Sequence, residues 1–181
     1  MGLMLQTPQQ TSTYFRAPGE TTPTEFTDAE KAALGNPPAN MYRLKIYAIS
    51  DAFQMPIAVE YQKPAYDGGP TKTQSTNVRP VFEVVEGPGA GKRFEGLITA
   101  ESFGPRTNLR KLWVACGLPM PDGKEFDLTD MIGAGEFKAF VTRDEKVKDG
   151  QTRFYSNVNW DTLEPVDAVT TSAPAPADNT W

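Results

Sequence analysis

The sequence contains no histidine among its 181 residues and a single cysteine, Cys116. The absence of histidine excludes hydrolases that depend on an imidazole base and every site with histidine metal ligands. One cysteine cannot form an intramolecular disulfide, which fits a reducing compartment. The carboxylates are scattered, and no two of them are spaced as an acid and base couple or as a calcium loop. We therefore expect a protein that is not an enzyme and that uses no metal and no cofactor.

A long apolar run is also missing, because no stretch approaches the roughly 18 to 20 residues that span a bilayer. The first residues, Met1 to Leu5, lack the basic flank of a signal peptide. We expect a soluble, cytoplasmic protein with no membrane partner. A chain of 181 residues with 39% hydrophobic residues, 15 glycines and 16 prolines favours one β-rich domain with many turns.

The chain has no overall excess of basic residues, since its net charge is −5. The acids gather at the ends. Residues 1–40 hold two basic and four acidic side chains, and residues 156–181 hold four acids and no Lys or Arg. The middle of the chain is close to neutral, so a local basic face remains compatible with nucleic-acid binding.

The stretch 77–116 predicts a β-hairpin followed by a helix. Alternating apolar residues form the two strands, and the glycine-rich turn 87–91 reverses the chain. From Asn108 onward, apolar residues at helical spacing predict a helix that ends at Gly117. Cys116 falls on the apolar face of this helix, so we expect a buried small hydrophobic side chain; a reactive thiol is the alternative.

An earlier strand is predicted from Met41 to Ile49, with Arg43, Lys45 and Tyr47 on the face opposite the apolar side chains. Cations and a ring on one strand face suit a nucleic-acid groove, and they also occur on ordinary exposed strands. An extended run that begins at Pro56 is either a strand of its own or a continuation of the first strand after a bend.

The remaining segments predict one loop and one hairpin. Residues 63–77 combine Gly, Pro and polar residues, which predicts a long loop. Two alternating runs, 136–143 and 151–160, flank a charged turn at 144–150 and predict a second hairpin. A shift of one residue in register would exchange the two faces of every strand.

Both ends of the chain are predicted to lie outside the packed domain. Residues 1–40 form a mostly flexible arm with one short helix over 29–34, where Thr27 and Glu30 make a capping box. Residues 161–181 form a disordered acidic tail. Four residues could anchor the arm to the domain or to a partner: Tyr14, Phe15, Arg16 and Phe26. The alternative is that these side chains have no role in a disordered arm.

The segment Gly87-Pro88-Gly89-Ala90-Gly91-Lys92-Arg93 has the composition of a phosphate-binding loop but not its spacing. Glu86 and Arg93 stand where such a loop needs a glycine and a Ser or Thr. The glycine spacing also differs from that of dinucleotide-binding turns. The segment is therefore predicted to be a hairpin turn, with Lys92 and Arg93 at its exit within reach of a phosphate backbone.

The predicted element order is three strands, a helix and two strands, which is the order of an OB-fold. We predict a mainly β chain: an OB-fold-like Greek-key barrel over residues 41–160, with one helix between its third and fourth strands. The arm 1–40 and the tail 161–181 flank it. OB-folds often bind single-stranded nucleic acids or oligosaccharides.

Three runs, RPVFEVVEGPGAGKRFEG, LRKLWVACGLP and GEFKAFVTRDEKVKDGQTRFYSNVNW, resemble in this order the OB-fold single-stranded-DNA-binding proteins of bacteriophages and bacteria. The resemblance covers about residues 41–181 and implies sequence-tolerant protection of single-stranded DNA during replication or recombination, in the host cytoplasm if the protein is phage-encoded. The acidic end is similar in layout to a partner-recruiting tail, which implies that Asp178 and Trp181 bind replication or recombination proteins. It lacks the run of acids and the Pro-Phe ending of the bacterial tail.

In this hypothesis, cations follow the phosphates while rings stack on bases at about 1 to 3 kcal/mol each. The alternative is a phage structural or protein-interaction module with no nucleic-acid role, which the acidic net charge and the two flanking arms favour. The sequence leaves the oligomeric state open, a homo-oligomer included. The candidate residues for binding single-stranded DNA are Arg43, Lys45, Tyr47, Arg79, Lys92, Arg93, Lys138, Phe140, Arg153 and Tyr155.

Overall fold

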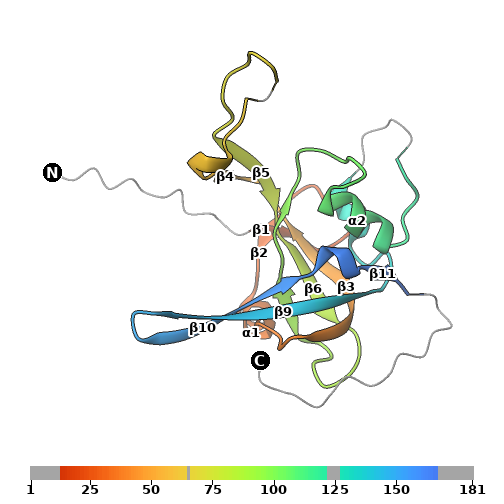
Figure 1. The fold of residues 1–181 in the computed structure, drawn as a ribbon. Coiled ribbons are helices and arrows are strands. Elements are labelled where there is room, and N and C mark those ends of the chain that lie inside the picture. Colours follow the sequence, from red (N-terminus) through yellow and green to blue (C-terminus); the bar gives the residue numbers. More distant parts are fainter. Residues whose placement is uncertain (1–12, 65, 122–126, 167–181) are drawn as a thin grey trace.

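The computed structural model describes residues 13–64, 66–121 and 127–166, and within them the chain is mainly β, with antiparallel sheets and two α-helices (Figure 1). The helices are α1 (Asp28–Ala33), α2 (Asn108–Ala115) and the short 3-10 helices η1 (Val59–Tyr61), η2 (Leu128–Met131) and η3 (Trp160–Thr162). The strands are β1 (Thr13–Phe15), β2 (Thr24–Glu25), β3 (Asn40–Ser50), β4 (Phe53–Pro56), β5 (Gln74–Val78), β6 (Pro80–Val84), β7 (Arg93–Glu95), β8 (Ile98–Thr99), β9 (Phe137–Lys148), β10 (Gln151–Val158) and β11 (Glu164–Pro165).

Strand β3 is the centre of the larger sheet. It pairs with β6 on one side and β9 on the other, and β9 pairs in turn with β10. The alternation predicted for β3 is confirmed, because Leu44 and Ile46 are buried while Arg43 and Lys45 on the opposite face are partly exposed. A smaller sheet contains β4, β5 and β8, and the two sheets share one hydrophobic core with α2.

The hairpin and helix predicted for residues 77–116 are confirmed. Strands β6 and β7 pair around the glycine-rich turn, and the Phe82 and Phe94 rings pack against each other in a tilted arrangement with centroids 5.2 Å apart. Helix α2 is capped by the Thr107 side chain and buries its apolar face. It is followed by Gly117, whose φ of 76° is the left-handed conformation that favours glycine at a helix end.

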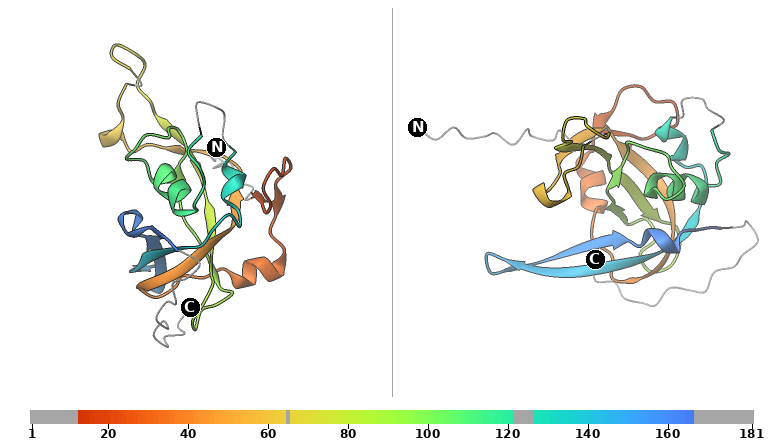
Figure 2. Two further views of the ribbon diagram at one scale, coloured as in Figure 1. Left: turned by 90° about the vertical axis from the view of Figure 1, so that its right-hand side faces the viewer. Right: turned by 45° about the horizontal axis from the view of Figure 1, so that its top comes forward.

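The prediction of an extended run that begins at Pro56 is wrong for the residues after Pro56. Strand β4 precedes it, and residues 59–61 form the 3-10 helix η1 on an extension that projects from the body (Figures 1 and 2). Val59 is 84% exposed, so these apolar side chains have no core to alternate against. The predicted loop 63–77 is shorter than expected, since its last four residues belong to β5.

Residues 13–40 pack on the sheet, although the sequence predicted a flexible arm. Tyr14 and Phe26 are only 2% and 6% exposed, and their rings stack with centroids 3.8 Å apart. They cover Ala48 and Val81, which face away from the main core. The predicted helix and capping box are confirmed by α1. Apolar burial therefore offsets the ordering entropy of this segment, a gain that depends on distant strands.

The sheet does not close into the predicted barrel: among the described residues, no pairing joins β7 or β8 to β10. Residues 34–37 occupy this gap instead. The Gly35 amide donates to the Arg93 carbonyl of β7 (2.9 Å), and the Ser156 hydroxyl of β10 donates to the Pro37 carbonyl (2.7 Å). We call this region the seam, because the segment 34–37 connects two strand edges that do not meet.

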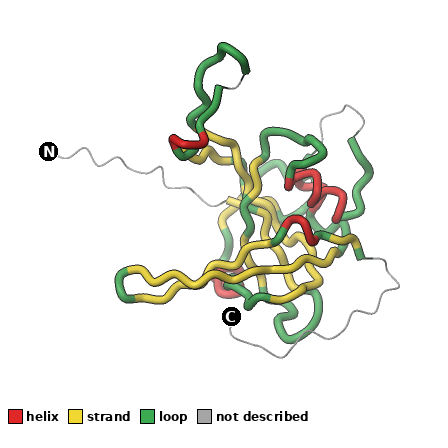
Figure 3. The backbone as a smooth tube through the Cα atoms, viewed as in Figure 1, coloured by secondary structure: helices red, strands yellow, loops and turns green. Residues whose placement is uncertain are grey.

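Hairpin β9–β10 projects beyond the body as a two-stranded ribbon (Figures 1 and 3). The charged turn predicted over 144–150 is wrong in extent: the strands pair up to Lys148 and Gln151, and only two residues make the turn. Asp149 and Gly150 both have positive φ, at 54° and 73°, as a type I′ turn requires. An Asp-Gly turn thus lets charged, solvent-exposed residues continue the strand pairing.

The chain after β10 returns to the body before the described residues end. Helix η3 follows β10, and β11 pairs with β9 through Glu164 opposite Lys138. The predicted disordered tail therefore does not begin at residue 161, because 161–166 pack on the domain. Residues 167–181 lie outside the described residues.

Gly135 is required by the close approach of two segments. A Cβ atom at this position would lie 2.5 Å from the Cys116 carbonyl oxygen. We expect Gly135→Ala to lower the free energy of unfolding by about 1 to 3 kcal/mol, because the backbones must move apart. Gly104→Ala is the control, since its Cβ would lie 3.9 Å from the nearest atom, on Thr107. Chemical denaturation measures both, and equal stabilities of the two variants would contradict this packing.

Candidate nucleic-acid interface

One face of the β9–β10 ribbon gathers cations that form no ion pair within the described part of the chain. Lys146 lies directly opposite Arg153, and Lys148 lies opposite Gln151. Lys146, Lys148 and Arg153 are exposed, and none of them forms an ion pair with the residues that the structure describes. Like charges directly opposite each other destabilise a strand pair, so a bound anion would relieve the repulsion.

Aromatic rings lie on the same face. Tyr155 is 42% exposed, and the Lys146 ammonium lies 5.4 Å from the centre of its ring. Toward the body the face continues through Phe140 and Lys138, which are partly exposed. Asp144, directly opposite Tyr155, is an exposed acid on the same face. We define the hairpin face as Lys138, Phe140, Asp144, Lys146, Lys148, Arg153 and Tyr155.

The predicted alternation of this hairpin is confirmed at its base and differs at its tip. Phe137, Val141 and Val158 point into the core, opposite the hairpin face. Phe154 was predicted to join them, but it is 42% exposed and stacks with Arg143, whose guanidinium carbon lies 4.5 Å from the ring centre. The reason is length, because the ribbon at Phe154 already extends past the body that would cover this ring.

Two predicted cations on β3 are neutralised by acids. Arg43 Nη2 lies 2.5 Å from Glu136, and its Nη1 lies 3.8 Å from Glu86. Lys45 Nζ lies 3.1 Å from Glu83 on the paired strand β6. The outer face of β3 therefore presents little net positive charge to a nucleic acid.

Tyr47 and Arg93 belong to a polar network between β3, β7 and the N-terminal segment. The Tyr47 hydroxyl donates to Glu30 (2.8 Å), which also pairs with Arg16 at 2.8 Å. Arg93 covers the Tyr47 ring, with its guanidinium carbon 3.6 Å from the ring centre, and pairs with Glu83 at 2.8 Å. Both predicted binding residues are thus committed to holding α1 on the sheet.

The pKa shifts of this network have direct causes. The Arg16 hydrogen bond, aided by the Thr27 amide and the Tyr47 hydroxyl, lowers the pKa of Glu30 to about 2, although burial opposes the shift. Burial, and then the hydrogen bond to Glu30, raises the pKa of Tyr47. Burial alone would raise the pKa of Glu83, but the hydrogen bonds from Arg93 and Lys45 outweigh it and lower the value. At neutral pH the Glu30 and Glu83 carboxylates are therefore ionised, while the Tyr47 hydroxyl stays protonated and donates its hydrogen bond.

The remaining predicted residues lie apart from one another. Lys92 is exposed at the exit of the β6–β7 turn. Arg79 lies at the seam, with its guanidinium carbon 4.7 Å from the centre of the Phe53 ring. It lines a depression of about 610 Å³ at the seam, and Tyr155 lines the same depression. The structure thus places Arg79 and Tyr155 on one depression, and it spreads Lys138, Phe140, Tyr155 and Arg153 in this order along one face of the ribbon.

Lys146 and Lys148 were missed from the sequence because they were assigned to a turn. The signal that identifies them is the Asp149-Gly150 pair, which is typical of a two-residue hairpin turn. Had the strands been extended up to this pair, alternation from Lys138 would have placed both lysines on the hairpin face.

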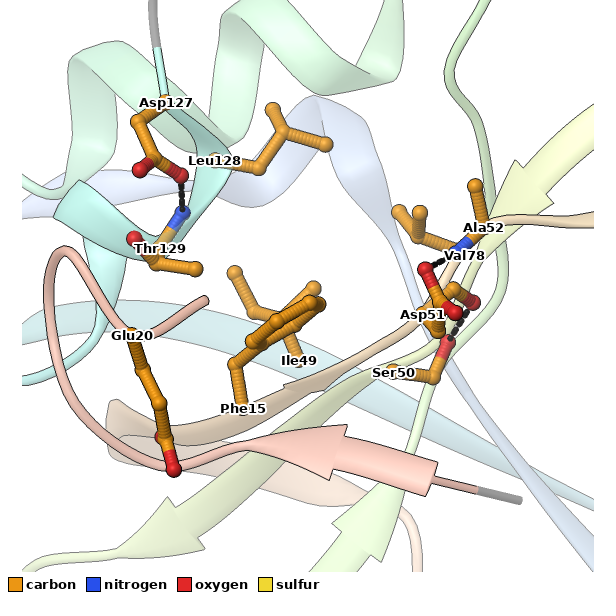
Figure 4. Close-up of a pocket in the computed structure, with 10 residues that line it drawn as sticks. All are labelled: Phe15, Glu20, Ile49, Ser50, Asp51, Ala52, Val78, Asp127, Leu128 and Thr129. Atoms are coloured by element: carbon orange, nitrogen blue, oxygen red, sulfur yellow. Dashed lines mark hydrogen bonds between the residues drawn. The ribbon is translucent and has the colours of Figure 1, made fainter. Parts of the chain in front are cut away.

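A second cavity, of about 520 Å³, lies where β1, the end of β3 and η2 meet (Figure 4). Its rim carries Glu20, Asp51 and Asp127, and its lining includes no Lys or Arg among the described residues. Asp127 and Asp51 accept hydrogen bonds from nearby backbone amides, both at 2.9 Å. Three carboxylates repel phosphates, so this cavity is not part of a nucleic-acid interface.

Cys116 is buried as predicted, and burial raises the pKa of its thiol to about 12. A protonated, covered thiol is a poor nucleophile. The described part of the chain contains no cluster of three or more acidic or thiol side chains that could hold a metal ion. No helix in the same residues has the length and apolar character to cross a membrane.

The residues predicted to recruit partners, Asp178 and Trp181, lie outside the described residues. No protein-family model, curated protein or solved structure matches the chain. Its function must therefore be inferred from the chemistry and geometry of the described side chains.

Proposed function

We propose that this protein binds single-stranded DNA along the hairpin face. It does not alter the DNA chemically, and binding depends little on the base sequence. The observation that carries the proposal is the facing pair Lys146 and Arg153 beside the exposed Tyr155 ring. Unpaired cations attract phosphates, and an exposed ring offers a stacking platform for a base. Nearer the body, Phe140 adds a second ring and Lys138 a further cation, which lies opposite Glu164 of β11.

The strand pairings support an OB-fold-like arrangement for the domain. Strands β3 and β4 correspond to the first strand of such a fold, β5 and β6 to the second, and β7 and β8 to the third. The first pairs with the second and with β9, and β9 pairs with β10, as in an OB-fold that is open between its third and fifth strands. In this arrangement the β9–β10 ribbon is the connection between the last two strands, which in OB-folds contributes to ligand binding.

The acidic C-terminal segment has a separate proposed role. The last residues carry Asp178 and an aromatic Trp181, and residues 156–181 contain no Lys or Arg. We propose that this segment recruits proteins of replication or recombination while the hairpin face holds DNA. Its negative charge would also compete with DNA for the hairpin face and reduce non-specific binding.

Fluorescence anisotropy with a labelled dT oligonucleotide of about 15 nucleotides tests the proposal. If four cations of the hairpin face each contact a phosphate, raising the salt from about 50 mM to about 200 mM should weaken binding about 50-fold. Absence of binding at low salt, both by the full chain and by a variant that ends at residue 166, would contradict the proposal and favour a protein-interaction module.

A further inference from the structure

The seam contains a depression of about 610 Å³ that the hairpin face does not include. Four separate parts of the chain form it: the segment 34–36, Arg79 between β5 and β6, the strand edge around residues 95–97, and β10 from Tyr155 to Asn157. Tyr155 also belongs to the hairpin face, so a strand bound there would pass the mouth of this depression. Its polar lining residues are Asn36, Arg79, Glu95, Ser156 and Asn157.

Hydrogen-bond donors reach the depression from two sides. The Asn36 side-chain oxygen accepts from the Ser156 amide (3.2 Å), which orients the group and leaves its NH₂ as a donor. Arg79 lines the depression from another side, and its guanidinium lies over the Phe53 ring. A guanidinium can donate two N–H groups in one plane to two adjacent acceptors on the edge of a base.

One carboxylate faces the same space. Glu95 accepts a hydrogen bond from the buried Tyr14 hydroxyl. A carboxylate has about four acceptor positions, so further donors can be accommodated. A negative group here would weaken binding of a bare phosphate, but it accepts hydrogen bonds from the amino group of a base. The depression therefore suits a base better than a phosphate.

We infer that the depression binds one base of the DNA strand and prefers guanine. Guanine offers the O6 and N7 acceptors to Arg79 and Asn36 together with an N2 amino donor for Glu95. Adenine has the N7 acceptor but carries an amino group in place of O6. This amino donor would face the donors of Arg79 and Asn36 and could not form a hydrogen bond with them. Tyr155, at the edge of the depression, is placed to stack on the same base or its neighbour. This inference rests on the proposed function.

The preference can be measured by competition anisotropy with three oligonucleotides: all dT, dT with one central dG, and dT with one central dA. We expect the dG oligonucleotide to bind about tenfold more tightly than the dA one. Equal affinities of all three would overturn base reading while leaving single-strand binding intact. If the protein binds none of the three oligonucleotides, both the guanine preference and the proposed single-strand binding are overturned.

The variant Glu95→Gln distinguishes a role of Glu95 in recognising the base from a role in folding. The substituted side chain still accepts from Tyr14, but it loses the charge that attracts the guanine amino group and repels phosphates. We expect the preference for dG to fall to about twofold or less, while affinity for the all-dT oligonucleotide stays equal or rises. A structural defect would instead weaken binding of every oligonucleotide. Glu60→Gln, which makes the same charge change at an exposed residue of η1, is the control and should keep the preference.

Asn157→Ala provides a second variant, because this exposed side chain can be removed without exposing the core. Its amide lies in the depression, so the dG preference should fall about two- to fivefold. An unchanged preference in both Glu95→Gln and Asn157→Ala would overturn the assignment of the base to this depression.

Discussion

The double variant Lys146→Glu with Arg153→Glu is expected to weaken binding of a dT oligonucleotide at least about 100-fold at low salt. Two phosphate contacts are lost, and two new acids repel the strand from the same place. The residues lie opposite each other on the ribbon, and two acids repel one another as two cations do. These side chains are exposed, so folding stability should change little even though Asp144 adds a third acid to this face in the variant, and urea denaturation checks this.

A matched control for this charge reversal is Lys31→Glu with Arg106→Glu. Both residues are exposed, one on α1 and the other in the loop before α2, and the change in net charge is the same. We expect this control to weaken binding less than about fivefold, through long-range repulsion alone. Equal losses in the two double variants would show that only net charge matters and would contradict a site on the hairpin face.

The second large effect is expected at Glu30. Its side chain is only 12% exposed, and it joins Arg16, the Thr27 amide and Tyr47. Glu30→Gln removes the charge that these donors share, so the partly buried Arg16 loses the carboxylate that forms its ion pair. We expect the free energy of unfolding near pH 7 to fall by about 2 to 3 kcal/mol.

The pH dependence of this effect follows from the lowered pKa of Glu30, about 2. A carboxylate with a lowered pKa stabilises the fold above its unfolded value of 4.5, and the stabilisation is lost as the pH falls toward 2. The difference between the native chain and Glu30→Gln should therefore shrink between about pH 4.5 and pH 2. Glu25→Gln, on the exposed β2, is the control. Urea denaturation near neutral pH and near pH 3 measures both, and a pH-independent difference would contradict this role.

Local patterning was enough to predict most of the strands and α2. In β3 the alternation of Leu44 and Ile46 with Arg43 and Lys45 identified the buried face correctly. Alternation in a strand and helical spacing in α2 can each be recognised from residues that are close in the sequence. The apolar faces that they predict then pack together in one core. The same reasoning found the capping box that begins α1.

Features that depend on distant residues could not be predicted. Nothing near Lys45 indicates that Glu83 will lie 3.1 Å away, so its charge appeared available for phosphates. Tyr14 and Phe26 suggested an anchor, but the cover that they form over Val81 requires β6 to be in place. The seam is a third case, because only the fold shows that residues 34–37 fill the space between β7 and β10.

The central claim is that the DNA strand lies along the hairpin face, and photo-crosslinking tests it most directly. A dT oligonucleotide with iododeoxyuridine at single positions is irradiated with the full-length protein, and the attached peptides are identified by mass spectrometry. We predict attachment at Tyr155 and Phe140, whose rings lie on that face. Attachment confined to Phe154 on the opposite face, or to Tyr61 and Tyr66 on the other projection, would contradict the claim.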